Sequence, residues 1–252
     1  MIKSRFSILL STLFCFAAQL TNAQSTRTIE FYDSIKNYDL STLWRADSLL
    51  NLEWVDDTMY FDPKMIVFPE PLGFIGDDFQ RFYIHFVSVS KDKSKPYQYD
   101  VLGKTKVKNT ICSFKGTIII YKSIIRRVEH DPPIKRGILS CHYRFYEDHN
   151  TIESGYFEGE LISNWCIYDR HILYDNIHSV SDGYCNNQFT GTWKSYKTNV
   201  VKKCHWGDFR IPDCGDLDVG AGDFGVNEKY RNNGWQSYMK STGPTENDQW
   251  WK

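Results

Sequence analysis

The segments FEGEL (residues 157–161) and FTGTW (residues 189–193) share a short pattern that recurs upstream as FKGTI (residues 114–118). Each copy has a phenylalanine, a glycine and a large apolar residue at alternate positions. Alternate side chains of a β-strand point to the same face, so each copy places an aromatic ring, a gap and a bulky side chain in one row. Glycine at such a position is typical of a curving sheet or of a closely approaching backbone. The repeat therefore predicts a curved antiparallel β core, most clearly within residues 155–214.

Alternating patterns continue on both sides of this repeat. Within residues 81–89, Phe82 and Ile84 fall on one face of a strand, while Tyr83 and His85 fall on the other. Turn signals separate about eight such segments, which predicts a mainly β fold, either an antiparallel barrel or a two-layer sandwich. The other candidate strands span residues 97–101, 111–125, 138–146, 156–167, 171–180, 188–196 and 200–206.

The region before these strands predicts an N-terminal arm. Residues 39–51 place Leu40, Leu43 and Trp44 near one helical face, and Asp39 can cap the first turn. We expect this helix to close one end of the sheet, with a lid or a partner-binding segment as the alternative. The expected division of the chain is an arm over residues 24–76, a β domain over residues 77–226 and a C-terminal tail over residues 227–252.

The first 23 residues have the layout of a secretory signal peptide. Lys3 and Arg5 supply positive charge, residues 6–18 form an apolar core, and residues 21–23 (TNA) form a small-residue cleavage signal. The apolar run is shorter than the ~20 residues that a membrane span requires. The leader, which ends Asn-Ala-Gln-Ser, resembles those of exported proteins from Bacteroidetes-type Gram-negative bacteria. These features predict an exported protein, either periplasmic or extracellular.

Charge gives no reason to expect a nucleic-acid partner. After removal of the leader, 28 basic and 31 acidic residues remain, which corresponds to a formal net charge of −3. A nearly balanced chain lacks the basic surface that nucleic acid or an anionic membrane attracts.

Six cysteines follow the leader, and an even number in an exported chain suggests disulfides. Cys204 and Cys214 flank a short loop, so we expect this pair to form the first bridge. Zinc is the alternative, but no Cys-x-x-Cys pair is present to begin a structural site. The other four cysteines are Cys112, Cys141, Cys166 and Cys185.

The loop after the last predicted strand is acidic and rich in glycine. Calcium binds six to eight oxygen ligands, which include carboxylates and backbone carbonyls. The spacing differs from that of an EF-hand loop, and aspartates that cap a solvated turn are the alternative. We therefore expect a structural calcium ion, if one is bound, at Asp213, Asp216, Asp218 and Asp223.

Aromatic residues are the remaining indication of function, because the chain has 8 Trp, 16 Tyr and 16 Phe. Exposed Trp and Tyr rings on a rigid sheet stack on sugars or anchor protein partners. Trp206 and Trp235 lie in turn-rich sequence near the acidic loop, and Tyr196 ends a predicted strand. We predict that these three residues bind a glycan or a protein. Trp193, by contrast, belongs to the face predicted to be internal.

Catalytic motifs are weak. Glu158 and Glu160 share one face of a predicted strand and could serve glycoside hydrolysis, but paired glutamates on a solvated face are much commoner. Cys141 and His142 are adjacent and point to opposite faces, so they do not form a nucleophile–base pair easily. The sequence contains no His-Glu-x-x-His, Gly-x-Ser-x-Gly or phosphate-binding loop.

Three functional hypotheses follow. The first is a non-enzymatic exported binding or structural protein that recognises a glycan or protein through surface aromatics. The second is a small-lipophile carrier in a calycin-like barrel, which needs an unfilled apolar interior. The phrase Gly191-Thr192-Trp193 resembles the Gly-x-Trp motif of lipocalin-like barrels, although there the motif lies on the first strand and here it lies near the end of the domain. The third is a secreted hydrolase that uses paired carboxylates. We expect binding rather than catalysis.

Overall fold

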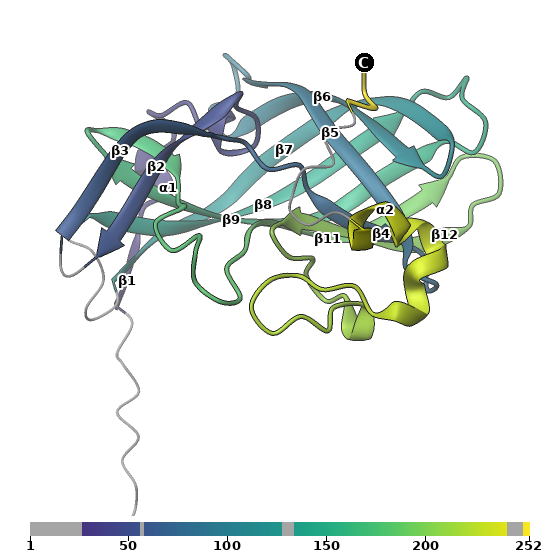
Figure 1. Cartoon of the computed structure of the whole chain (residues 1–252). Coiled ribbons are helices and arrows are strands. Elements are labelled where there is room, and N and C mark those ends of the chain that lie inside the picture. The colour runs from purple at the N-terminus through teal and green to yellow at the C-terminus, as the bar shows by residue number, and fades with distance from the viewer. Residues whose placement is uncertain (1–26, 56–57, 128–133, 241–248) are drawn as a thin grey trace, which may run out of the picture.

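The computed structural model describes residues 27–55, 58–127, 134–240 and 249–252. The predicted signal peptide over residues 1–23 lies outside the described residues. Within the described part the chain is mainly antiparallel β-structure, so the predicted fold class is confirmed (Figure 1).

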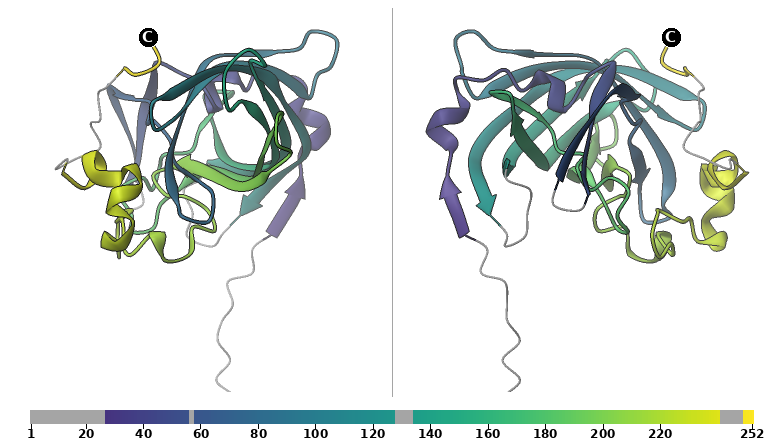
Figure 2. Two further views of the ribbon diagram at one scale, coloured as in Figure 1. Left: turned by 90° about the vertical axis from the view of Figure 1, so that its right-hand side faces the viewer. Right: turned by 60° about the vertical axis from the view of Figure 1, so that its left-hand side comes forward.

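Eight strands pair in a closed ring. Each strand of this set pairs with the next one along the chain, and β12 (Val201–Asp208) returns to pair with β4 (Leu72–Ile75). Cys204 lies opposite Ile75 at this junction. Figure 2 shows the strands closing around one axis, so the architecture is an antiparallel barrel. The remaining strands of the ring are β5 (Gln80–Lys91), β6 (Gln98–Val107), β7 (Thr110–Arg127), β8 (Lys135–Glu147), β9 (Gly155–Tyr168) and β11 (Asn186–Ser195).

Four further strands lie beside the ring. The strand β1 (Arg27–Glu30) pairs with the end of β7, and β10 (His171–Tyr174) pairs with the end of β9. The strands β2 (Ser48–Val55) and β3 (Thr58–Val67) form a separate hairpin. The strand predicted over residues 171–180 is therefore confirmed only for its first four residues.

The helix predicted over residues 39–51 is wrong in extent. The structure has two short helical segments, α1 (Tyr32–Ile35) and η1 (Ser41–Leu43), and the chain then enters β2. Asp39 does accept a hydrogen bond from the Ser41 N–H at 3.0 Å, but the residue at the cap position of η1 is Leu40, whose side chain makes no capping bond. Leu50, however, pairs with Met65 in the β2–β3 hairpin, and this cross-strand pairing replaces the helical hydrogen bonds.

The interior of the barrel is filled by aromatic rings. Phe189 stacks on Trp206 with ring centroids 4.7 Å apart, and Tyr143 contacts both rings edge-on. These side chains belong to one continuous core with the Phe and Trp residues of the repeated pattern. The prediction that the repeat faces inward is therefore confirmed for Phe114, Phe157, Phe189 and Trp193, all of which are buried.

The glycines of the repeat allow two strands to approach closely. Gly159 on β9 lies directly opposite Gly191 on β11. A Cβ atom at Gly159 would lie 2.0 Å from the Thr190 carbonyl oxygen, and one at Gly191 would lie 2.2 Å from the Glu158 carbonyl oxygen. Neither position has space for a side chain, which explains why both residues are glycine.

A C-terminal extension packs on the outside of the ring. It contains η2 (Gly215–Leu217), η3 (Glu228–Tyr230), the irregular turn η4 (Arg231–Trp235) and α2 (Gln236–Lys240). A second apolar cluster joins it to β4 through Phe74. The extension appears in yellow-green at the lower right of Figure 1. Within the described residues, no helix has the length and apolar character needed to pass through a membrane.

The predicted disulfide between Cys204 and Cys214 is not formed. All six described cysteines have free thiols. Cys204 packs in the core of the barrel, whereas Cys214 belongs to the external cluster of the C-terminal extension. The wall of the barrel thus separates these two cysteines, although a short loop connects them in the sequence.

Candidate functional site

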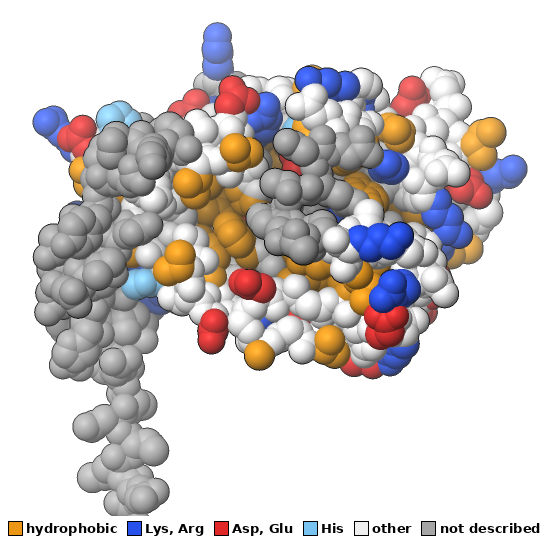
Figure 3. All heavy atoms as spheres, in the orientation of Figure 1, with side chains coloured by type: hydrophobic (Ala, Val, Ile, Leu, Met, Phe, Trp, Pro, Cys, Tyr) orange, Lys and Arg blue, Asp and Glu red, His pale blue; other side chains and the backbone are white. Residues whose placement is uncertain are grey.

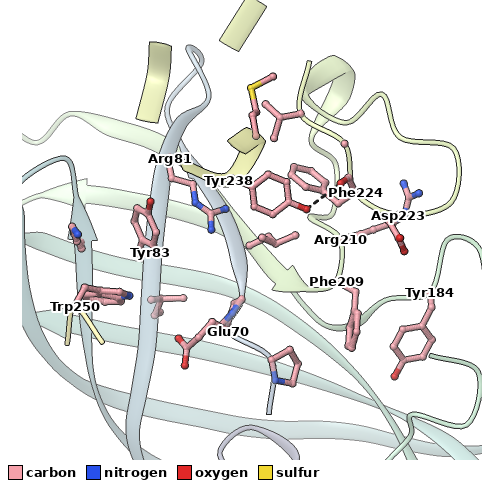
Figure 4. Close-up of a pocket in the computed structure, with 18 of the residues that line it drawn as sticks. Glu70, Arg81, Tyr83, Tyr184, Phe209, Arg210, Asp223, Phe224, Tyr238 and Trp250 are labelled. Carbon is pink, nitrogen blue, oxygen red and sulfur yellow. Dashed lines mark hydrogen bonds between the residues drawn. The ribbon is translucent and has the colours of Figure 1, made fainter. Parts of the chain in front are cut away.

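A pocket of about 630 Å³ lies between the outer face of β5 and the segments that cover it. Its walls come from the connection before β4, the loop before β11, the chain after β12, α2 and the C-terminus. Figure 3 shows hydrophobic side chains in a hollow on this face of the molecule, with Lys and Arg side chains beside it. Figure 4 shows the residues around the cavity. The principal side chains are Glu70, Arg81, Tyr83, Lys106, Tyr184, Phe209, Arg210, Asp223, Phe224, Tyr238 and Trp250.

The alternation of β5 produces the inner wall of this pocket. Phe82 is buried in the core, while Tyr83 and His85 are only partly buried on the outer face, so the predicted alternation is confirmed. Lys106 on β6 lies directly opposite Tyr83, and Lys104 lies opposite His85. Strand pairing therefore fixes a row of aromatic and cationic side chains along the outside of the barrel.

Tyr83 is the centre of this row. The Arg81 guanidinium carbon lies 4.7 Å from the centroid of the Tyr83 ring, and the Lys106 Nζ lies 5.3 Å from the same centroid. The ring of Trp250 lies 6.0 Å away, centroid to centroid. The Tyr83 ring thus contacts two cations and a second aromatic ring, a favourable arrangement because the π faces are electron-rich.

Arg81 connects the row to the C-terminal extension. Its guanidinium carbon lies 4.4 Å from the Trp235 ring centroid and 5.8 Å from that of Tyr238. The Trp235 indole N–H donates to the Phe79 carbonyl at 2.8 Å. These contacts hold α2 over the pocket, and Figure 4 shows Arg81 between Tyr83 and Tyr238.

The last residues of the chain cover the other end of the row. The Trp251 ring stacks on His85 with centroids 3.9 Å apart and an interplanar angle of 6°. The His85 Nδ1 lies 2.9 Å from a carboxylate oxygen of Glu70. The segment Gln249–Lys252 is therefore joined to the outer face of β5 through described contacts, although it is distant in the sequence.

The four aspartates of the predicted calcium site do not converge. Asp216 accepts hydrogen bonds from Lys229 and from the Tyr230 hydroxyl, and the bond from Lys229 lowers the pKa of its carboxyl. Asp218 forms an ion pair with Arg210 at 2.5 Å. Among the described residues, no group of three or more His, Cys, Asp or Glu side chains has metal-binding geometry. Of the four aspartates, Asp223 lines the pocket, while Asp213 lies in an exposed turn.

Arg210 organises the loop of these aspartates. Besides Asp218, its guanidinium donates to the Gly222 carbonyl at 2.5 Å and to the Gly220 carbonyl at 3.2 Å. The Asp218 carboxylate in turn accepts from the Gly220 backbone N–H at 2.9 Å. Arg210 lines the pocket, but its hydrogen bonds serve to hold the loop in place.

Two of the predicted binding residues are internal. Trp206 and Trp235 both have 0% exposed surface, so the prediction that they lie at the surface is wrong. Trp206 is in the barrel core and Trp235 is in the external cluster. Their turn-rich sequence context suggested exposure. The C-terminal extension covers the Trp235 ring, however, and the barrel encloses the Trp206 ring.

Tyr196 is partly exposed, as predicted, but it lies outside the wall of the pocket. Its ring stacks on His149 with centroids 3.7 Å apart and lies 6.1 Å from the Tyr156 ring. Tyr156 in turn lies 5.9 Å from Tyr146, which is 41% exposed. These four rings form a second row of aromatics, on β8, β9 and the adjoining turns.

The residues considered for catalysis lie outside the wall of the pocket. The Glu158 carboxylate pairs with Arg144, and that of Glu160 lies 2.7 Å from His142 Nδ1. Cys141 is fully buried, and burial raises the pKa of its thiol well above the usual value. A thiol in this environment is a poor nucleophile because the reactive thiolate is disfavoured.

No motif in the sequence marked the pocket residues Arg81, Lys106, Tyr238 and Trp250. The alternation of β5 gave a partial signal, since it placed Tyr83 on the face opposite Phe82. Nothing in the local pattern indicated that α2 and the C-terminus return to that face, because this contact spans more than 150 residues.

The chain matches no protein-family model, and no curated protein and no solved structure is significantly similar to it.

Proposed function

We propose that this chain is a non-enzymatic binding protein that holds a glycan in the pocket on the outer face of β5. The observation that supports this proposal most strongly is the composition of the wall. Partly exposed rings of Tyr83, Tyr238 and Trp250 lie beside the charged groups of Glu70 and Lys106. Aromatic rings stack on the apolar faces of sugars, and charged side chains bind their hydroxyl groups.

The size of the pocket agrees with a small ligand. A volume of about 630 Å³ lies within the range of roughly 300–1,000 Å³ that is usual for small-molecule sites.

Binding is a better explanation than hydrolysis. Glycoside hydrolysis needs two carboxyl groups on opposite sides of the reacting bond, one of them with a raised pKa. Burial raises the pKa of Asp208 to about 8, but this side chain is enclosed and does not line the pocket. Glu70 lines the pocket and is paired with His85. The described carboxyl groups of the pocket therefore give no support for an acid–base pair.

The carrier alternative has less support than glycan binding. A carrier needs an unfilled interior, whereas the rings of Phe82, Phe157 and Trp206 lie 5.4–6.1 Å apart, centroid to centroid, inside this barrel. The proposed ligand instead binds outside the ring. Export, predicted from residues 1–23, is part of the proposal because it would bring the site into contact with extracellular or periplasmic glycans.

The test is an oligosaccharide array probed with the chain from Gln24, followed by calorimetry with the sugars retained. We expect Tyr83→Ala and Trp250→Ala to weaken binding by about ten-fold or more, since each removes a stacking ring. Tyr121→Ala is the matched control, because Tyr121 is 43% exposed and lies outside the pocket.

The variant Tyr196→Ala tests which of the two aromatic surfaces binds the ligand. Loss of binding in this variant alone would place the ligand on the second row of rings. Failure to retain any sugar, or equal affinity in all the folded variants, would overturn the proposal.

A further inference from the structure

One phenylalanine in the wall of the pocket has a backbone conformation that is rare for its type. Phe209 has a φ of +67°, in the left-handed region that bulky side chains seldom adopt. The Arg210 backbone N–H donates to the Asp208 carbonyl at 2.8 Å, so Phe209 is the central residue of a γ-turn. A γ-turn with a positive φ at its centre is the rare and strained form. Such strain persists only where the surroundings impose it, and it is concentrated at functional sites.

Both neighbours of Phe209 are held by contacts that fix the turn. The Asp208 carboxyl accepts a hydrogen bond from the Asn187 Nδ2 at 2.7 Å and is almost completely enclosed. On the other side, Arg210 forms its ion pair with Asp218 at 2.5 Å. The chain is therefore anchored before and after Phe209. The turn, rather than the residue's own conformational preference, places this ring in the wall of the pocket.

Phe209 and Tyr184 together form an apolar corner of the pocket. Their rings meet edge to face with centroids 4.9 Å apart, and both residues line the cavity. The Tyr184 hydroxyl donates to the carbonyl of Asp175, a residue that is only 2% exposed. The polar end of the Tyr184 ring is therefore bonded to the buried part of the chain. Figure 4 shows this corner on the opposite side of the cavity from Tyr83 and Trp250.

The chemistry of this corner favours a methyl group over a hydroxyl group. Phe209 has no polar atom in its side chain, and the hydroxyl proton of Tyr184 is already used. A sugar hydroxyl placed against the two rings would lose its hydration without gaining a hydrogen bond from them, which is unfavourable. A methyl group in the same place would be removed from water at no such cost, which is favourable.

We infer that the ligand is a glycan with a small apolar substituent, and that the corner of Phe209 and Tyr184 binds this substituent. An N-acetyl group, an O-acetyl group and a 6-deoxy carbon all present the methyl group that the corner fits. This inference rests on the proposed function, in which Tyr83 and Trp250 stack on the sugar ring. Phe209 is then the residue that determines which sugars are bound.

The experiment compares matched neutral oligosaccharides that differ in one substituent. Each parent sugar, with a hydroxyl at the position tested, is paired with its N-acetyl, O-acetyl and 6-deoxy forms, and calorimetry measures the affinities. We expect one substituted form to bind about five-fold or more tightly than the parent sugar, because its methyl group is buried. The difference should be the same in low and high salt, since no charge is recognised. The three forms identify which substituent is preferred.

Substitutions of Phe209 locate the bound substituent. Phe209→Gly should remove most of the preference for the substituted sugar, and we expect this variant to fold because glycine adopts a positive φ without strain. Phe209→Leu keeps an apolar side chain and should retain only part of the preference. Asn199→Gly is the control, because Asn199 also has a positive φ, of 56°, is exposed and lies outside the pocket. Thermal melts verify that each variant is folded.

The outcomes distinguish this inference from the proposed function. If parent and substituted sugars bind equally through Tyr83 and Trp250, the proposed function holds and the inference about the substituent is overturned. A preference that survives in Phe209→Gly also overturns it, since the substituent would then be recognised elsewhere. If Phe209→Gly does not fold, an undiminished preference in Phe209→Leu has the same meaning. If no sugar binds, both proposals are rejected.

Discussion

Asp208, at the end of β12, has a carboxyl group that is almost completely enclosed. One of its oxygens accepts hydrogen bonds from the Asn187 Nδ2 at 2.7 Å and the Tyr174 hydroxyl at 3.0 Å. Burial raises the pKa of this carboxyl to about 8, because the charged form loses its hydration. The folded state therefore holds Asp208 as a neutral acid at pH values where the unfolded chain would ionise it.

This difference predicts a pH-dependent stability. Between the ordinary aspartate pKa of about 4 and the folded pKa of about 8, the folded protein binds more protons at Asp208 than the unfolded chain does. Its contribution to the free energy of unfolding therefore falls as the pH rises through this window. Asp208→Asn should remove that contribution, and the variant should lose less Tm than the parent between pH 5 and pH 8.

The control for this experiment is Asp47→Asn, since the Asp47 side chain is 94% exposed. Thermal melts followed by circular dichroism measure the effect. Equal slopes of Tm against pH for the parent and Asp208→Asn would show that the carboxyl is already ionised in the folded protein.

A second prediction at this scale concerns Gly191. An added Cβ would lie 2.2 Å from the Glu158 carbonyl oxygen and 2.5 Å from the Tyr143 hydroxyl, so the strands must move apart. Gly191→Ala should lower the free energy of unfolding by about 1–3 kcal/mol, the usual cost of overpacking. Urea denaturation measures this, with Ser113→Ala on the exposed face of β7 as the control. Unchanged stability would mean that β9 and β11 are less closely apposed than described.

At the scale of elements, the C-terminal segment Gln249–Lys252 forms part of the pocket without belonging to the core. Trp250 and Trp251 contact Tyr83 and His85, and neither tryptophan is a member of an internal cluster. A chain that ends at Asp248 should therefore keep its Tm within about 2 °C, because surface changes away from the core usually alter stability little.

The same truncation should weaken the binding of a retained sugar, because it removes one aromatic wall. Calorimetry with the full and shortened chains compares the two affinities. A large loss of Tm would instead assign Trp250 and Trp251 a structural role, and undiminished affinity would exclude them from the binding site.

At the scale of the whole molecule, the closed barrel has a filled interior. Phe189 stacks on Trp206 and contacts Phe86 and Tyr143 edge-on. Phe189→Ala should lower the free energy of unfolding by about 3–5 kcal/mol, as is usual for loss of a buried ring. The parent protein should not bind a fluorescent fatty-acid probe within the ring. The carrier hypothesis would be restored if the parent protein took up the probe saturably and Phe189→Ala changed that uptake.

Free thiols provide a further test of the whole molecule. The structure has all six described cysteines reduced, five of them buried. Alkylation of the unfolded, unreduced chain from Gln24, which lacks Cys15, should therefore modify six thiols, with mass spectrometry as the measurement. Modification of two fewer thiols would indicate a disulfide and would require a different arrangement around Cys204 and Cys214.

The sequence predicted the strands with a strong alternating pattern and missed those without one. The face assignments of Phe82, Tyr83 and the repeated Phe-x-Gly pattern are confirmed, since a period of two residues directly reflects strand geometry. Leu72–Ile75 was missed because four residues between Pro71 and Gly76 are too short to show a period. This strand nevertheless closes the barrel through its pairing with β12.

The candidate site depended much more on tertiary structure. The sequence placed Tyr83 on the face opposite Phe82, but it could not show that Lys106 lies opposite this ring or that Trp250 returns to it. It also predicted exposure for Trp235, which α2 and the loop at Phe224 bury. Exposure depends on which segments cover a side chain, and a local pattern contains no information about segments far along the chain.

The sequence by itself determined that this protein is an antiparallel β structure with an aromatic interior, because strand periodicity and the glycine positions are local properties. Only the tertiary structure decided that the ring closes, that the six described cysteines keep free thiols, and that Arg81 and Lys106 meet at Tyr83. Each of these depends on the register between strands or on the path of the C-terminal extension. The physical reason is that such contacts arise from burying one surface against another, and residues far apart in the chain supply the two sides.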